Sequence, residues 1–182
     1  MLPVATNTSH EVRFVRTADI QELIRLRSYL LSSGKGFYAS QSHDEDARWK
    51  KEFETWALPQ INDTTSVAMA VIDSPTPLHL SCCGIGIIDA RPPGPGIMNG
   101  KVGWIQSIVT DPQSRRQGLA GGIITFLMAW FSRSDVHRIM LNTTPDAADL
   151  YRGFGFAPCG EDALVWNDHQ ERHQNNEYFW GT

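Results

Sequence analysis

The stretch that decides the fold is DPQSRRQGLAGG, from Asp111 to Gly122, which separates two apolar segments. The segment before it, VGWIQSIVT (102–110), is rich in β-branched and aromatic residues and lacks proline, which predicts a buried strand. The segment after it, LAGGIITFLMAWF (119–131), carries its large apolar residues at helical spacing. A strand, a basic glycine-containing turn and a helix are therefore expected in succession.

This turn has the composition of a phosphate-binding loop. A helix N-terminus presents unpaired N–H groups and about half a positive charge, and glycines let a ligand approach the backbone closely. Arg115 and Arg116 add positive charge, and Gln117 adds another donor. An ordinary surface turn before a core helix is the alternative, because glycines near arginines are a weak signal by themselves. The sequence does not contain GxGxxG or a GKS/GKT ending, so neither standard nucleotide loop fits.

Two motifs resemble one known family. The pattern R-x-x-G-x-A, formed by Arg115, Gly118 and Ala120, resembles the acetyl-CoA loop of the GCN5-related N-acetyltransferases (GNAT). Downstream, AADLYRGFGF (147–156) resembles the family's A-x-x-L-Y-x-x-x-G-F segment, whose tyrosine is Tyr151 here. The two motifs occur in the family's order, so the sequence is identified as a member of this superfamily over most of its length.

The resemblance implies acetyl-CoA as cofactor, CoA as product, and direct transfer of the acetyl group to a neutral amine. Backbone N–H groups of the sheet would stabilise the oxyanion, and Tyr151 would protonate the departing thiolate. Asn142 would meet the pantetheine or an ordered water, or it caps a turn. The cofactor-binding residues implied in this way are Ile108, Val109, Thr110, Arg115, Arg116, Gln117, Gly118, Leu119, Ala120, Gly121, Asn142 and Tyr151.

The general base is where the sequence departs from the family pattern. Many members carry a glutamate on the central strand, but 101–110 contains no acidic residue. Gln106 and Ser107 are candidates to hold a water that removes the proton, and Asp89 is the nearest acidic candidate. Asp89 pairing with Arg91 at the start of a loop is the alternative. An acceptor amine with a pKa of about 8 needs a base less than lysine does, which favours an amino sugar or similar amine.

The expected acceptor is a small molecule with a primary amine, and an aminoglycoside-type antibiotic is the specific expectation. Tyr38, Trp104 and Trp166 are candidates to wall its pocket, and Asp44 begins an acidic run that would attract a cation. The alternative is that the aromatic residues belong to the core, as aromatic residues usually do, and that the acidic run is a solvated helix start. Two other functions stay open: acetylation of a protein N-terminus or lysine, which needs an open peptide groove, and a non-catalytic acyl-CoA-binding sensor.

Composition fits one compact enzyme domain. The chain has 182 residues, of which 41% are hydrophobic and 20% charged, so it can bury a sizeable core. A net charge of −4 argues against nucleic-acid binding. Three cysteines without disulfide or metal-ligand spacing favour a reducing cytoplasm, and no segment is apolar enough to cross a membrane. The aromatic residues 178–180 make a homodimer contact conceivable.

The expected architecture is an α/β domain with a GNAT-like mixed central sheet, in the order β-αα-βββ-α-β-α-β. Thr17 is the expected cap of the first helix, and the second is expected to end before Pro59 with Trp49, Phe53 and Trp56 facing the core. A flexible N-terminus (1–10), a single acetyltransferase domain (11–167) and a tail (168–182) are expected. The expected elements are strands at 12–16, 66–73, 78–89, 102–110, 137–142 and 163–166, and helices at 20–31, 43–58, 118–131 and 145–153.

Overall fold

The computed structural model describes residues 10–32 and 39–160. The chain divides into two compact units, with the boundary between Thr143 and Thr144. The first unit holds the sheet and its three main helices. The second holds the segment that contains Tyr151.

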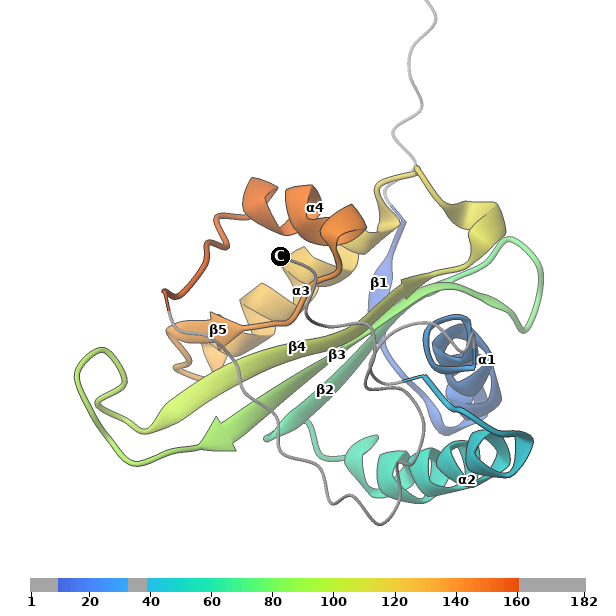
Figure 1. Cartoon of the computed structure of the whole chain (residues 1–182), viewed down its shortest axis with the longest axis horizontal. Coiled ribbons are helices and arrows are strands. Elements are labelled where there is room, and N and C mark those ends of the chain that lie inside the picture. The colour runs from blue at the N-terminus through green and yellow to red at the C-terminus, as the bar shows by residue number, and fades with distance from the viewer. Residues whose placement is uncertain (1–9, 33–38, 161–182) are drawn as a thin grey trace, which may run out of the picture. The chain divides into compact units, whose positions relative to one another are not determined.

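The first unit is built on one mixed five-stranded sheet in the order β1-β2-β3-β4-β5 (Figure 1). Neighbouring strands are antiparallel from β1 to β4, and β5 runs parallel to β4. This arrangement confirms the α/β class and the expected order as far as the described residues extend. The strands are β1 (Val12–Phe14), β2 (Val67–Asp73), β3 (Leu80–Ala90), β4 (Lys101–Thr110) and β5 (Arg138–Met140).

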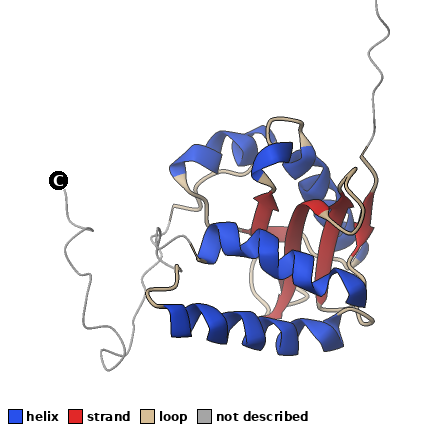
Figure 2. Ribbon diagram, turned by 90° about the vertical axis from the view of Figure 1, so that its right-hand side faces the viewer, coloured by secondary structure: helices blue, strands red, loops and turns tan. Residues whose placement is uncertain are grey.

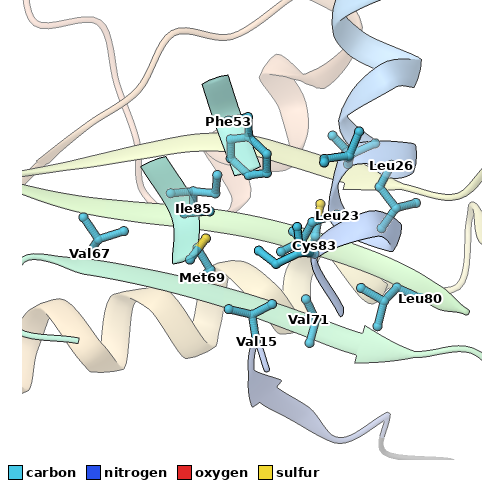
Figure 3. Close-up of a cluster of buried hydrophobic side chains, with 14 residues drawn as sticks. Val15, Leu23, Leu26, Phe53, Val67, Met69, Val71, Leu80, Cys83 and Ile85 are labelled. Carbon is cyan, nitrogen blue, oxygen red and sulfur yellow. The ribbon is translucent and has the colours of Figure 1, made fainter. Parts of the chain in front are cut away.

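Helices cover both faces of this sheet (Figures 1 and 2). On one face lie α1 (Ile20–Leu31) and α2 (His43–Gln60), and on the other lies α3 (Leu119–Arg133). The α3 face of the sheet carries glycines: an added Cβ on Gly84 would lie 2.4 Å from Ile123 Cγ2, so α3 packs directly on the backbone there. The core under α1 and α2 is apolar (Figure 3) and includes Val15, Leu23, Leu26, Phe53, Val67, Met69, Val71, Leu80, Cys83 and Ile85.

Three local expectations were wrong. Thr17 does not cap α1; it begins a 3₁₀ turn (Thr17–Asp19), and the Asp19 carboxylate accepts the backbone N–H of Arg16 instead. The helix α2 continues through Pro59 to Gln60, because a proline in the last turn removes only one terminal hydrogen bond. Trp56 is 38% exposed, while Phe53 takes the buried position on that helix.

The second unit begins with a 3₁₀ turn (Pro145–Ala147) followed by α4 (Ala148–Gly153). Thr144 occupies the N-cap position of this turn, and Pro145 is its first residue. The predicted strand at 163–166 and the aromatic residues 178–180 lie outside the described residues. None of the described helices is both long and apolar enough to span a membrane.

Candidate active site

The basic turn leads directly into α3. Asp111 begins it: its side chain accepts the backbone N–H of Gln113, and Pro112 starts a 3₁₀ turn that ends at Ser114. The chain then reaches Gly118, whose φ of 77° lies in the left-handed region that glycine adopts without strain. Gly118 is the N-cap of α3, so the helix starts where the sequence predicts.

Seven consecutive backbone N–H groups in this turn have no acceptor within the part of the chain that the structure describes. No described residue accepts a hydrogen bond from the N–H groups of residues 115–121, and the first bond into α3 runs from Gly122 to Gly118 at 3.3 Å. Arg115 and Arg116 are exposed, and the space where a Cβ of Gly118 would stand is open for 4 Å. Donors without a described acceptor, the positive end of a helix dipole and two exposed arginines are the features that suit an anion.

A half-buried ion-pair network fixes the start of the turn to α1. Arg25 donates to Asp111 at 2.6 Å and to Glu22 at 2.8 Å, and Glu22 also accepts the backbone N–H of Leu80 at 3.0 Å. Burial opposes the charged forms of Glu22 and Asp111, but the hydrogen bonds from Arg25 and the backbone outweigh it and hold both pKa values below their ordinary range. The anion site is therefore braced by α1 and β3.

Strand β4 is interrupted next to this turn. The register with β3 shifts between Cys83 and Ile85, and Ser107 on β4 has a φ of 53°, which marks a bulge. On its other side, β4 pairs with β5 only as far as Trp104. Beyond that point no described strand pairs with this edge of β4, so backbone groups of residues 108–110 are left for a ligand to pair with. The strands β4 and β5 therefore pair only over residues 102–104 of β4.

A hollow of about 190 Å³ lies beside the bulge, lined by Ile87, Asp89, Trp104 and Gln106. Gln106 stands opposite Ile85 and Trp104 opposite Ile87, and directly paired residues project to one face. Ile85 packs in the core under α1 and α2, so the hollow is on that face. Trp104 Nε1 is buried and has no hydrogen-bond partner among the described residues. Three residues predicted separately are thus brought together.

Asp89 is at the far end of this hollow. It pairs with Val102, four residues along β4 from Gln106, which corresponds to about 13 Å along the strand. Its carboxylate accepts from Arg91 at 3.1 Å and is 40% exposed, so the alternative pairing expected from the sequence is present. A proton released near Gln106 could therefore reach Asp89 only through intervening water.

A positive charge that sequence reasoning missed stands next to Ser107. Arg27 of α1 donates from Nε to Ser107 Oγ at 3.2 Å, and its guanidinium lies 4.1 Å from the ring centroid of Phe53 and 5.6 Å from that of Trp49. Burial lowers the pKa of Arg27. Arg27 stands out only because folding brings α1 and α2 together and places its guanidinium against Phe53 and Trp49. The sequence does not show this contact.

The acidic residues at the start of α2 are largely committed to other partners. Asp46 accepts from Lys50 at 2.5 Å, from Trp49 Nε1 at 2.8 Å and from the Ser32 hydroxyl; the first of these contributes most to a lowered pKa of Asp46. Glu45 accepts the backbone N–H of Gln41 at 2.7 Å. Asp44 is exposed. The run behaves mainly as a capped helix start, the alternative noted above.

The remaining predicted residues are dispersed. Asn142 follows β5 and is exposed. Tyr151 is 9% exposed on α4 in the second unit, where its ring packs edge-on against Phe156 at 6.0 Å. Tyr38 and Trp166 lie outside the described residues. Among the residues that the structure covers, no group of three or more His, Cys, Asp or Glu side chains is placed to hold a metal ion.

With this geometry established, comparison with known proteins decides the family. The model of the acetyltransferase (GNAT) family matches residues 34–156, about two thirds of the chain. The chain belongs to the GNAT acetyltransferase family. It is therefore an acetyl-CoA-dependent N-acetyltransferase, as the two motifs predicted.

Solved structures share the fold at low identity. A GCN5-related N-acetyltransferase from Ralstonia eutropha JMP134 has a TM-score of 0.70 and 20% identity, covering 86% of this chain and 97% of that one. A predicted acetyltransferase from Clostridium acetobutylicum, solved with acetyl-CoA, has a TM-score of 0.70 and 19% identity, covering 90% and 99%. AAC(6')-Iy, in complex with the bisubstrate analogue CoA-S-monomethyl-acetylneamine, has a TM-score of 0.61 and 14% identity, covering 87% and 97%. No curated protein gives a significant match.

The described residues fit the cofactor of this family. Acetyl-CoA carries a diphosphate, which suits the seven unpaired N–H groups and two free arginines of the turn. Its pantetheine arm carries two amides, which suit the unpaired edge of β4 beyond Trp104. Both features are on elements of the first unit, and the bulge at Ser107 immediately precedes residues 108–110 on β4.

Proposed function

We propose that this acetyltransferase modifies a primary amine of a small molecule, held on the face of the sheet that α1 and α2 cover. The observation that carries the proposal is the hollow beside the β4 bulge, which at about 190 Å³ is the size of a small functional group or sugar ring rather than a peptide groove. Trp104 offers an apolar wall, and Gln106 offers an amide. These groups suit a compact polar acceptor.

The catalytic roles follow from the chain's own residues. Acetyl-CoA supplies the acetyl group as a thioester. The N–H groups of residues 115–121, with Arg115 and Arg116, bind the diphosphate, and the backbone of residues 108–110 aligns the arm along β4. Tyr151 would supply a hydroxyl proton to the leaving sulfur. Asn142 bonds the arm near the end of β5.

The proton of the attacking amine leaves through solvent. Because β4 carries no carboxylate, Gln106 and the Ser107 hydroxyl hold a water that accepts this proton. Ser107 Oγ accepts from Arg27, so its own O–H remains available to donate to such a water. Asp89, farther along the hollow, takes up the proton through further water. An amine that binds in its neutral form needs no stronger base than this water to remove its proton during the transfer.

An aminoglycoside-type antibiotic is the narrower candidate. The shared fold with AAC(6')-Iy makes it reasonable, and Asp44 and Asp89 offer acidic groups. The support from α2 is smaller than its sequence implies, because Asp46 and Glu45 already have partners. Aminoglycosides therefore form one class in the acceptor panel. We also propose a cytoplasmic site of action, since Cys82 and Cys83 are free thiols buried in β3.

The test is CoA release from acetyl-CoA by the purified protein over a panel of aminoglycosides, other amino sugars, amino acids, polyamines and lysine-containing peptides. Turnover of small amines with peptides inactive supports the proposal. Turnover confined to peptides or protein N-termini would overturn it in favour of protein acetylation. Tight acetyl-CoA binding without any turnover would indicate a sensor. Gln106→Ala should raise KM for the amine, while Asn99→Ala, on the β3–β4 loop outside the hollow, should leave it unchanged.

A further inference from the structure

Three arginines near the start of the chain have very different surroundings. Arg13 contacts the carboxylates of Asp19 at 2.7 Å and Asp73 at 2.5 Å. Arg25 contacts those of Glu22 and Asp111. Arg13 and Arg25 each form ion pairs with two carboxylates. In each case hydrogen bonding to these carboxylates raises the pKa of the guanidinium. Arg27 is on the same helix as Arg25 but has no carboxylate partner among the described residues.

The position of Arg27 is costly for a charged group. Removing a guanidinium from water is unfavourable unless an opposite charge or hydrogen bonds replace the water. Cation–π attraction to the faces of Phe53 and Trp49 offsets part of this unfavourable free energy. Ser107 Oγ also accepts one hydrogen bond from Nε of Arg27. The Nη1 and Nη2 groups donate to no described residue, so four of the five N–H donors of Arg27 are available.

The contacts of Arg27 also fix its orientation. Its plane is held between two aromatic rings of α2 and the hydroxyl at the β4 bulge. A guanidinium held in this way has lost its side-chain freedom before any ligand arrives, and its paired Nη groups match a carboxylate or phosphate bidentately. Ser107 adjoins Gln106, which lines the hollow on the same face of the sheet. The free fork is thus at the bulge, beside the proposed acceptor position.

We propose that Arg27 binds an anionic group of the acceptor, so that the enzyme acetylates an amine whose molecule also carries a carboxylate or a phosphate. This inference rests on the proposed function, because it assigns the acceptor to this face of the sheet. The diphosphate of the cofactor does not compete for Arg27, since the turn at residues 115–121 has donors of its own. Because Arg27 repels a polycation, this inference favours the anionic amines of the acceptor panel over its aminoglycosides.

The test uses pairs of primary amines that differ only in the anion. An amino acid is compared with its amide, and an amino sugar with its phosphate ester, so that the two arms separate carboxylate from phosphate recognition. In one arm the anionic member should show a kcat/KM roughly 10- to 100-fold above its neutral counterpart, the range of charge-assisted hydrogen bonds. Equal kcat/KM within both pairs would overturn the inference while leaving the proposed function intact.

Variants then assign the effect to Arg27. Arg27→Gln should bring the anionic acceptor down to the level of the neutral one, mainly through KM, with the neutral acceptor and the KM for acetyl-CoA little changed. Arg27→Lys keeps the charge without the fork and should lose part of the preference. Arg48→Gln, an exposed arginine on α2, is the matched control and should behave as wild type. Equal loss with both members of a pair would overturn the inference, because it assigns Arg27 to the fold or to the acetyl transfer itself.

Two further measurements test Arg27 if Arg27→Gln does not fold or if no amine is acetylated. Should Arg27→Gln fail to fold by circular dichroism, the Arg27→Lys comparison decides: a loss confined to the anionic acceptor supports the inference, and an equal loss contradicts it. Should no amine be acetylated, the proposed function fails, and anion binding decides instead. With the turn saturated by CoA, acetate or inorganic phosphate should bind wild type more tightly than Arg27→Gln or Arg27→Lys; equal binding would overturn the inference.

Discussion

Replacing Gly118 by alanine separates backbone strain from cofactor binding. Gly118 has a φ of 77°, and the space around its missing Cβ is open for 4 Å within the described chain. Alanine at this position therefore meets no protein atom and carries only the left-handed backbone penalty, about 1–2 kcal/mol. For a chain of this size, that penalty lowers Tm by about 2–8 °C.

The effect on acetyl-CoA binding should be much larger than this strain. The Cβ would stand among the seven unpaired N–H groups, in the open space that the diphosphate is expected to occupy. Losing one or two charge-assisted hydrogen bonds, each worth about 1.5–3 kcal/mol, weakens binding by roughly 10-fold or more. Isothermal titration calorimetry with acetyl-CoA measures this change, and a thermal melt measures the strain.

Gly160 offers the matched control for Gly118. Its φ is 81°, and its missing Cβ also meets no described atom within 4 Å, so Gly160→Ala carries the same strain outside the turn. Both variants should lower Tm by similar amounts, and only Gly118→Ala should weaken acetyl-CoA binding. An affinity for acetyl-CoA equal to wild type in Gly118→Ala, with the Tm loss of the control, would refute the assignment of this turn to the diphosphate.

Three further predictions concern catalysis, packing and acid stability. Tyr151→Phe should lower kcat by about 100-fold or more, the contribution of a general acid, with the Kd for acetyl-CoA retained; an unchanged kcat assigns Tyr151 to packing. Gly84→Ala places a Cβ 2.4 Å from Ile123 Cγ2 and should cost about 1–3 kcal/mol of unfolding free energy in urea titration; no loss would contradict the close approach of α3. Glu22, whose pKa is lowered on folding, stabilises the fold above its ordinary pKa of 4.5, and this stability is lost as the pH falls through the lower folded value. Glu22→Gln should therefore be less stable at neutral pH, with a smaller further loss in acid; a pH profile parallel to wild type would show that the pair with Arg25 does not matter.

The local patterns predicted most of the elements, because periodicity and capping are encoded within a few residues. The apolar runs before and after the turn became β4 and α3, and Gly118 starts the helix as expected. Thr144 and Pro145 marked the start of the segment that leads to α4. The family motif in the turn also proved to be a set of unpaired donors, a property that follows from its position before a helix.

Features that depend on pairing across the fold were not accessible in this way. The bulge at Ser107 has no glycine to mark it and appears only in the register with β3. Trp56 has the spacing of a core residue, but Phe53 occupies the buried face and leaves it exposed. Arg27 differs from Arg25 only in the partners that folding supplies, two carboxylates for one and two aromatic rings for the other.

The most direct test of the central claim is an amide-resolved NMR titration of the ¹⁵N-labelled protein with acetyl-CoA. The account predicts that the largest chemical-shift changes occur at the backbone N–H groups of residues 115–121, which donate to no described residue, with further changes at residues 108–110. Saturable binding that leaves these amides unchanged, with the shifts concentrated elsewhere, would contradict it.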